Sequence, residues 1–188
     1  MADSVNHFIK QVSIKKMYEG DVYITNDPWK GTGHLHDITV VTPTFLNSNL
    51  IGFFACTAHV VDIGGRGFGA DANSVYEEGI HIPIIKLIEK GKLNNTLIEI
   101  IQSNVRESNQ VVGDIFALTS CNKVGQKRLL EMMCEFNIKN LNLLSNYIFK
   151  ISKKTTEQLI NQLPKKVVNG SMIIDGYKRP IDLKVKIN

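Results

Sequence analysis

The sequence predicts an α+β fold, with a β-rich N-terminal half that carries the candidate site and a mostly helical C-terminal half. Runs rich in β-branched and aromatic residues, bounded by glycine and asparagine, fill the chain up to about residue 61. From residue 94 onward, apolar residues recur at helical spacing. A chain of 188 residues can bury one sizeable core and is too short for three ordinary domains.

The N-terminal half is predicted to begin with a short amphipathic helix over residues 2–17, because Val5, Phe8 and Val12 share one helical face. Alternation predicts a strand over residues 21–25. Residues 26–33 contain a proline and two glycines and are therefore predicted to be a loop. Two β-like runs follow and predict a hairpin or neighbouring strands, with a turn-rich connection over 43–49; the runs are 38–42 and 50–61.

The C-terminal half is predicted to be helical over most of its length and to end in two strands. The predicted helical segments are 96–101, 111–119, 125–136 and 138–160. Alternation over residues 170–187, with a turn at Asp175-Gly176, predicts a strand pair. The chain is thus divided into a mixed β and loop region, a helical region and a strand pair, over residues 1–93, 94–165 and 166–188.

Composition and charge exclude several classes of protein. Hydrophobic residues make up 43% and charged residues 21% of the chain, which argues against disorder and low-complexity structure. The net charge of +4 comes from scattered lysines, so nucleic acid is not an expected partner. No window approaches 18 uncharged apolar residues and the N-terminus lacks the apolar core of a signal peptide, so no membrane is expected and the predicted compartment is the cytoplasm.

The cysteines indicate neither a disulfide framework nor a cysteine-based zinc site. There are three, Cys56, Cys121 and Cys134, without CxxC spacing. Buried free thiols are the expected state.

Two His-Asp pairs mark the candidate metal site. In the segment from His34 to Asp37, residues 34 and 36 share one face of an extended chain, whereas a bend at the preceding glycines would bring His34 and Asp37 together. The second pair is His59 and Asp62, and His59 follows 22 residues after Asp37, a separation that suits return on an adjacent strand. Imidazole and carboxylate ligands with open positions suit a catalytic Mn, Fe or Zn. The alternative is that these pairs only make surface hydrogen bonds.

Other catalytic motifs are missing from the sequence. The glycine-rich segment 64–69 lacks both the P-loop pattern and a GxGxxG pattern that opens a helix, so this chain is not expected to bind a nucleotide. A serine nucleophile elbow is absent, and Cys121 has no histidine near it in sequence. Covalent catalysis therefore has no positive support.

Several segments in consistent order resemble the hydantoinase B/oxoprolinase family. The first are residues 20–29 (GDVYITNDPW) and 33–43 (GHLHDITVVTP), which resemble the family signature GDVxxxNDPxxGxxHxxDxxxxxP. Residues 58–65 (AHVVDIGG) and 76–83 (YEEGIHIP) are similar to two further family elements. The segments 104–106 (NVR), 113–114 (GD) and 125–130 (GQKRLL) continue the match.

The resemblance implies a metal in this chain and ATP on a partner. Family members work with an A-type subunit that uses ATP, and in the carboxylases the B-like portion carries a metal held by a His-x-x-Asp pair and a later His. These ligands correspond to His34, Asp37 and His59, so a divalent Mn, Fe or Zn is expected there. His36 and Asp62 are then candidates to orient a ligand imidazole, with loop hydrogen bonding as the alternative.

Three further residues are candidate catalytic or substrate-contacting groups. Asn26 and Asp27 precede His34 on its loop, where capping of an Asn-Asp-Pro turn is the alternative role. Arg66 could bind an anionic intermediate bidentately, or could be a solvated loop charge.

The implied function is that of a B-type subunit or fragment of an ATP-dependent enzyme that hydrolyses a cyclic amide together with an A-type partner. One alternative is a subunit of the acetone or acetophenone carboxylase type, which carboxylates a ketone at a metal site. Another is a non-catalytic assembly partner. The chain resembles an internal fragment or a shortened member, and it departs from the family pattern where Val60 replaces a second His and His81 replaces an Arg.

Overall fold

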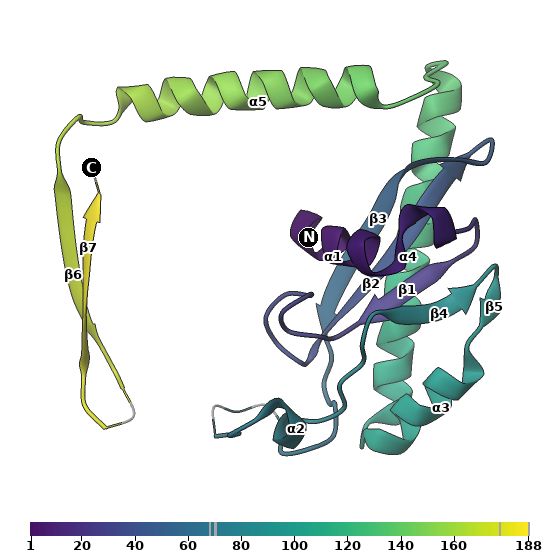
Figure 1. Cartoon of the computed structure of the whole chain (residues 1–188), viewed down its shortest axis with the longest axis horizontal. Helices are drawn as coiled ribbons and strands as arrows, with labels where there is room; N and C mark the ends of the chain where they lie inside the picture. Colours follow the sequence, from purple (N-terminus) through teal and green to yellow (C-terminus); the bar gives the residue numbers. More distant parts are fainter. Residues whose placement is uncertain (68, 70, 177, 188) are drawn as a thin grey trace. The chain divides into compact units, whose positions relative to one another are not determined.

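The computed structural model describes residues 1–67, 69, 71–176 and 178–187 (Figure 1). The chain forms two compact units, residues 1–140 and 141–188, which are described separately. The N-terminal unit contains an antiparallel sheet, and helices dominate the chain after residue 94. The predicted α+β class is confirmed.

The first unit contains four α-helices, a short 3₁₀ helix and five strands in the part of the chain that the structure describes. Its helices are α1 (Ala2–Val12), η1 (Ile14–Lys16), α2 (Val75–Glu78), α3 (Asn95–Asn104) and α4 (Ser108–Glu135). Its strands are β1 (Val22–Thr25), β2 (Asp37–Leu46), β3 (Asn49–His59), β4 (Ile85–Glu89) and β5 (Lys92–Leu93). The strand order is β3-β2-β1-β4-β5, and every neighbouring pair is antiparallel.

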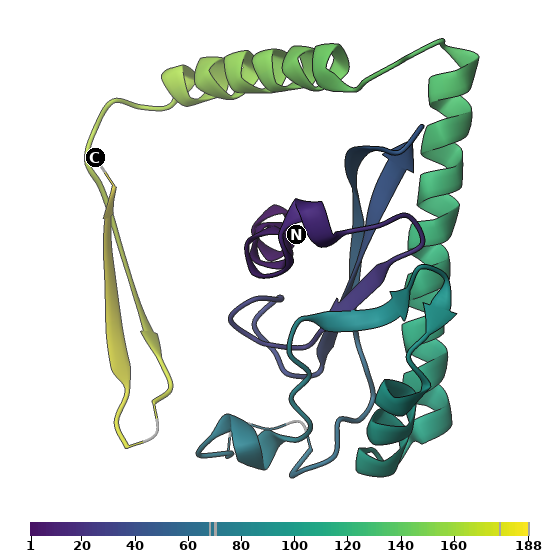
Figure 2. The same ribbon diagram turned by 45° about the vertical axis from the view of Figure 1, so that its right-hand side comes forward.

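Successive side chains along a strand point to opposite faces of the sheet, and apolar residues on both faces of this sheet are covered. Ile24 and Val40 belong to the larger core, which also contains residues of α3 and α4. Tyr23 and Val41, which point to the opposite face, belong to a smaller core with Phe8 of α1. Figures 1 and 2 show α4 on one side of the sheet and α1 on the other.

Helix α4 packs directly on the β2–β3 hairpin. Asn122 is buried and donates hydrogen bonds to the Val40 carbonyl and the Thr42 hydroxyl, both at 3.1 Å. One turn further on, a Cβ on Gly125 would lie 2.5 Å from the Phe54 ring, so a larger residue there would require the ring to shift. The helix runs without a break across residues 120–124, where two separate helical segments were predicted.

The β2–β3 hairpin confirms the predicted strand pairing but corrects its length. Residues 43–46 belong to β2, and the connection is only Asn47-Ser48, both with positive φ. Pro43 fits in the strand because the pairing of β2 with β1 ends at Val41, so no ladder hydrogen bond to β1 is lost there. The strands β4 and β5 at the opposite edge of the sheet were not predicted individually.

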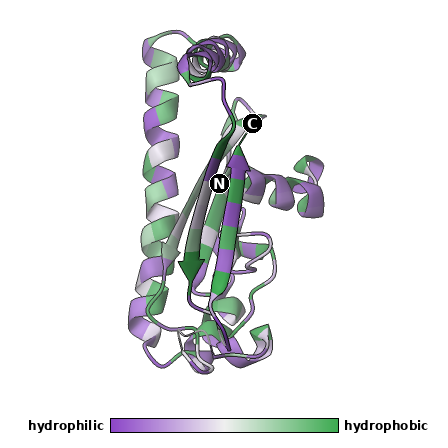
Figure 3. Cartoon of the chain, turned by 90° about the vertical axis from the view of Figure 1, so that its left-hand side faces the viewer, coloured by the Kyte–Doolittle hydropathy of each residue, from purple (hydrophilic) through white to green (hydrophobic). Residues whose placement is uncertain are grey.

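The second unit consists of helix α5 (Asn142–Gln162) and a hairpin of β6 (Val168–Ile174) and β7 (Ile181–Ile187). The predicted C-terminal strand pair is confirmed, and its register runs from Val168 opposite Ile187 to Ile174 opposite Ile181. Hydrophobic and hydrophilic residues alternate along β7, whereas β6 ends in three consecutive apolar residues, Met172 to Ile174 (Figure 3). Within the described ranges, no helix is long and apolar enough to span a bilayer.

The cysteines are free thiols, as expected, but they are not all buried. Cys56 of β3 is half-buried, and burial together with the neighbouring Cys121 raises its pKa to about 11. Cys121 and Cys134 are exposed, which contradicts the predicted burial. Both lie on α4, whose sheet-facing side is taken by other residues, Val111, Ile115, Leu118 and Asn122 among them.

Candidate active site

A tight turn brings His34 and Asp37 together at the start of β2. The Asp37 backbone N–H donates to the His34 carbonyl at 3.1 Å, which closes the turn. The His34 Nδ1 atom lies 3.3 Å from Asp37 Oδ2. Of the two conformations considered for this segment, the bent one is the one observed, because Gly33 precedes it with a φ of 102°.

His59 reaches the same carboxylate from the end of β3. Asp37 and His59 are directly opposed in the β2–β3 register, and His59 Nδ1 lies 2.7 Å from Asp37 Oδ1. The carboxylate is largely buried, with 15% of its side chain exposed, whereas the side chains of His34 and His59 are 59% and 47% exposed. The cluster of His34, Asp37 and His59 therefore has a buried anion and two accessible imidazoles.

Hydrogen bonds keep Asp37 ionised. Burial alone would raise its pKa, but the hydroxyl of Thr32, at 2.7 Å, and the two imidazoles outweigh burial and hold the pKa below its ordinary value. An ionised carboxylate only accepts hydrogen bonds, so each imidazole donates from Nδ1. Asp37 thereby sets the tautomer of both imidazoles when they are neutral.

His36 packs against the His59 ring of the cluster. It is buried, and its ring stacks on that of His59 with centroids 5.1 Å apart and an interplanar angle of 12°. Burial and the neighbouring His59 lower the pKa of His36, and the nearby carboxylates of Asp62, Glu78 and Asp37 offset only part of this effect. The stacked His36 ring restricts the orientation of the His59 ring.

Asp62 holds the chain just after β3. It accepts hydrogen bonds from Nε and Nη2 of Arg106, at 3.1 and 2.5 Å, and from the backbone N–H groups of Arg106 and Gly64. The Arg106 side chain is the main cause that lowers the pKa of Asp62 far below its ordinary value, against the opposing effect of burial. The observed bonds of Asp62 thus fix the loop that leads away from His59.

Asn26 is fully buried, and its amide joins three backbone groups. It donates to the carbonyls of Leu35 and Ile80, at 2.8 and 2.9 Å, and accepts from the Ile82 N–H at 2.6 Å. These bonds tie the His34–Asp37 turn to the segment before β4. The predicted contact of Asn26 with substrate stays a prediction, and the contacts seen in the structure are ones that position the turn.

Asp27 is also buried and organises its own loop. It accepts from the backbone N–H of Trp29 at 3.0 Å and forms ion pairs with Lys30 at 3.1 Å and His81 at 3.6 Å. Burial alone would raise the pKa of Asp27, but these partners outweigh burial and lower it. The predicted loop-capping role of Asp27 is therefore seen, and its catalytic role stays a prediction.

Arg66 is engaged within the glycine-rich loop. Its Nη1 atom lies 3.1 Å from Glu77 Oε2 and 3.2 Å from the Asp71 carbonyl. The glycines allow close crossing of backbones, because a Cβ on Gly64 would lie 2.2 Å from the Asn104 carbonyl oxygen. Phe68, within this loop, lies outside the described residues.

The donor types of the cluster suit a divalent metal. Imidazole nitrogens and a carboxylate oxygen are ligands for Mn, Fe and Zn, and the two exposed imidazoles leave access from solvent. In the part of the chain that the structure describes, no group of three or more His, Cys, Asp or Glu already has the arrangement of a metal site. His34, Asp37 and His59 are instead joined by hydrogen bonds.

Two adjoining hollows lie beside the cluster. The smaller, with a volume of ≈ 150 Å³, is lined by His34 and His36 among others, and the larger, with ≈ 620 Å³, is lined by Trp29 and neighbouring loop residues. Gly33 and Glu78 line both. The larger volume is in the usual range for a small-molecule site.

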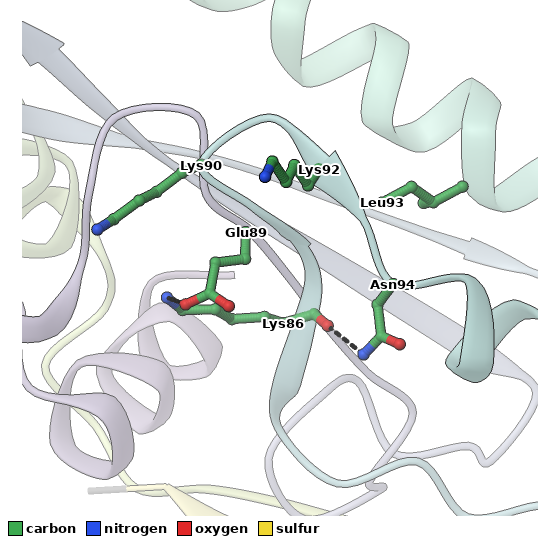
Figure 4. Close-up of a pocket in the computed structure, with 6 residues that line it drawn as sticks. All are labelled: Lys86, Glu89, Lys90, Lys92, Leu93 and Asn94. Carbon is green, nitrogen blue, oxygen red and sulfur yellow. Dashed lines mark hydrogen bonds and ion pairs between the residues drawn. The ribbon is translucent and has the colours of Figure 1, made fainter.

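A separate hollow of ≈ 440 Å³ lies on the β4–β5 edge of the sheet (Figure 4). Its lysines are Lys86, Lys90 and Lys92, and Lys86 is already paired with Glu89 at 2.7 Å. This hollow contains none of the predicted site residues.

Three residues of the site were not predicted as such: Thr32, Arg106 and Glu78. Thr32 binds Asp37, and Arg106 binds Asp62 from 44 residues away. Glu78 lines both hollows. The segment containing Arg106 was noted as a family element, but no spacing in the sequence could pair it with Asp62, because that contact depends on how α3 and α4 meet the sheet.

Comparison with known proteins gives a consistent picture. The chain is 31% identical over 163 residues to a Pseudomonas protein named as the proposed B-type component of a D-/L-hydantoinase, covering 85% of this chain and 28% of that protein. The crystal structure of an ATP-dependent caprolactamase from Pseudomonas jessenii matches 99% of this chain and 34% of its own, with a TM-score of 0.84 and 25% identity. The fold is also shared with an acetone carboxylase, at a TM-score of 0.64 and 21% identity over 75% of this chain and 19% of that one.

The chain thus spans less than a third of the curated hydantoinase relative that it matches. The family model for hydantoinase B/oxoprolinase matches residues 1–188, the whole length of the chain. The chain belongs to the hydantoinase B/oxoprolinase family.

Proposed function

We propose that this chain supplies the metal-binding part of an ATP-dependent enzyme that hydrolyses a cyclic amide, in complex with an A-type partner that uses ATP. The observation that carries the proposal is the meeting of His34, Asp37 and His59 at the paired ends of β2 and β3. The family, and the naming of relatives as subunits or as caprolactamase, support the reaction class and the partner.

His34, Asp37 and His59 are the residues that would hold a divalent Mn, Fe or Zn. A metal bound there would supply Lewis-acid chemistry and lower the pKa of bound water. The chain's own contribution is orientation: Asp37 fixes both imidazoles, and the stacked ring of His36 restricts His59. Asn26 holds the turn on which His34 lies.

Metal retention by the purified chain tests the ligand assignment. Elemental mass spectrometry is expected to find near-stoichiometric Mn, Fe or Zn in the parent chain and a loss of that metal in His34→Ala and His59→Ala. His7→Ala, on α1 and outside the cluster, is the matched control and is expected to retain the metal. Equal metal content in all four proteins would contradict the assignment.

The reaction itself is tested with the partner present. The chain is combined with an A-type subunit, ATP and a lactam, and ring opening is followed by mass spectrometry of the product. His59→Ala is expected to abolish ring opening while leaving binding of the A-type subunit intact. Undiminished ring opening by His59→Ala would contradict a catalytic role for the cluster.

A further inference from the structure

Two of the three cysteines meet where helix α4 packs on β3, an edge strand of the sheet. Cys56 lies on β3 and Cys121 on α4. The Cys56 thiol donates a hydrogen bond to the Leu118 carbonyl at 3.3 Å, and Leu118 lies three residues before Cys121 on the helix. Burial raises the pKa of the Cys56 thiol to about 11, and the neighbouring Cys121 thiol adds to this effect by charge and by hydrogen bonding. The two thiols are therefore neighbours across the contact between α4 and β3.

The packing of α4 along β3 independently places the two cysteines opposite each other. Gly125 of α4 lies against the ring of Phe54 on β3. Two residues along a strand span about 6.6 Å, and four residues along an α-helix span about 6 Å. The step from Phe54 to Cys56 on the strand therefore matches the step from Gly125 back to Cys121 on the helix.

A hydrogen bond beside the pair holds this alignment. Asn122 is buried and donates to the Val40 carbonyl at 3.1 Å. Val40 is directly opposite Cys56 in the pairing of β2 with β3. The residue that follows Cys121 is thus bound to the residue that pairs with Cys56, which opposes motions that would separate the two thiols.

The third cysteine lies too far away to compete for either thiol within one chain. Cys134 is thirteen residues beyond Cys121 on the same helix, a distance of about 20 Å along the helix axis. Two cysteines whose Cα atoms are more than about 7 Å apart cannot be bridged without backbone movement. Cys121 and Cys134 are both exposed, so a small oxidant reaches each of them. Of these two exposed thiols, Cys121 is the one that has Cys56 beside it.

We propose that Cys56 and Cys121 form an oxidative modification site, in which hydrogen peroxide converts the two thiols into a disulfide that joins β3 to α4. The exposed Cys121 sulfur attacks a peroxide oxygen, the O–O bond breaks, and Cys121 becomes a sulfenic acid as one water leaves. The Cys56 sulfur then attacks the sulfenic sulfur, the S–O bond breaks, and the hydroxyl group leaves as a second water with the Cys56 proton. The two thiols lose two electrons and two protons, and the peroxide is reduced to two waters.

The disulfide links the strand that carries His59 to a second element. Cys56 lies three residues before His59 on β3, and β2 is the neighbouring strand of β3 in the sheet. Oxidation adds a covalent bond to α4 on the helix-covered face. This inference goes beyond the proposed function and does not depend on metal binding or on the reaction class.

Peptide mapping of the oxidised chain tests the proposal. The folded chain is treated with hydrogen peroxide, its remaining thiols are alkylated, and it is digested with trypsin. Cleavage after lysine and arginine separates the three cysteines into the peptides 31–66, 107–123 and 129–139. We expect a disulfide-linked pair of 31–66 with 107–123, which separates on reduction and weighs two hydrogen atoms less than the two free peptides. It should be at least about tenfold more abundant than either pair that contains 129–139.

Cys134→Ser is the matched control, because it removes an exposed cysteine of the same helix, and it is expected to give the linked pair in unchanged yield. Cys121→Ser is expected to leave Cys56 as a free thiol, and circular dichroism checks that both variants are folded. The same treatment in urea should give all three pairings, since the folded packing is then lost. Three free thiols after oxidation of the folded chain, a Cys121 that is oxidised without linking to Cys56, or a mixture of pairings equal to that in urea would overturn the proposal.

Discussion

Replacement of Asn26 by alanine is expected to destabilise the first unit strongly. The substitution removes the amide that serves one buried carbonyl, one part-buried carbonyl and one buried N–H group, at distances of 2.6–2.9 Å. Each buried group left without its partner costs about 1–3 kcal/mol. Because carbonyls on loops can find water more easily than an N–H can, the lower end applies, and the expected loss is about 3 kcal/mol.

Urea unfolding followed by the fluorescence of Trp29 measures this loss within the first unit. For a slope of about 2 kcal/mol per molar urea, the midpoint is expected to fall by about 1.5 M at unchanged slope. Asn26→Asp keeps the side-chain volume and the oxygen acceptor but removes both donors. It therefore separates the hydrogen bonds from the cavity, and it is expected to retain most of the destabilisation.

Asn109→Ala is the control, because Asn109 is exposed on α4. It is expected to change the free energy of unfolding by less than about 0.5 kcal/mol. If Asn26→Ala were no more destabilising than Asn109→Ala, the reasoning that the buried amide holds the turn would be refuted.

Three other predictions concern backbone, charge and thiols. Gly64→Ala should lower the melting temperature, because Gly64 has a φ of 77° and the new Cβ would lie 2.2 Å from the Asn104 carbonyl oxygen. Gly113→Ala, in open space on α4, should raise the melting temperature by favouring helix. The opposite order in thermal unfolding would contradict the close approach of the Gly64 and Asn104 backbones. Burial alone would raise the pKa of Asp21, but hydrogen bonds outweigh burial and lower it. The stability that Asp21 contributes is therefore present above its unfolded pKa of about 3.9 and is lost as the pH falls through the folded pKa. An acid titration of the free energy of unfolding should show this loss, and Asp21→Asn should flatten it. Cys121 should react with a thiol reagent well before Cys56, whose pKa is about 11; equal rates in single-cysteine variants would contradict the difference in environment.

Local sequence pattern was sufficient for several elements. The β2–β3 hairpin was predicted from runs rich in β-branched and aromatic residues, helix α5 from helical spacing and the C-terminal strand pair from alternation. Helix α5, β6 and β7 have no buried residue, so for them the pattern identified the element without a buried face. Helix α4 was predicted as two segments, because Asn122 interrupts the apolar pattern. The structure shows that this polar residue faces the sheet and is buried by hydrogen bonds to β2.

The sequence by itself determined the fold class, the family resemblance and the residue types of the candidate site, since motif order and side-chain chemistry are properties of the chain alone. Only the tertiary structure decided that His34 bends toward Asp37, that Asn26 clamps the turn and that Arg106 pairs with Asp62. These contacts join residues up to 56 positions apart in the Asn26–Ile82 bond and 44 apart in the Asp62–Arg106 pair. Such pairings follow from how the β2–β3 hairpin, the segment before β4 and the junction of α3 with α4 pack together, and local periodicity carries no record of that packing.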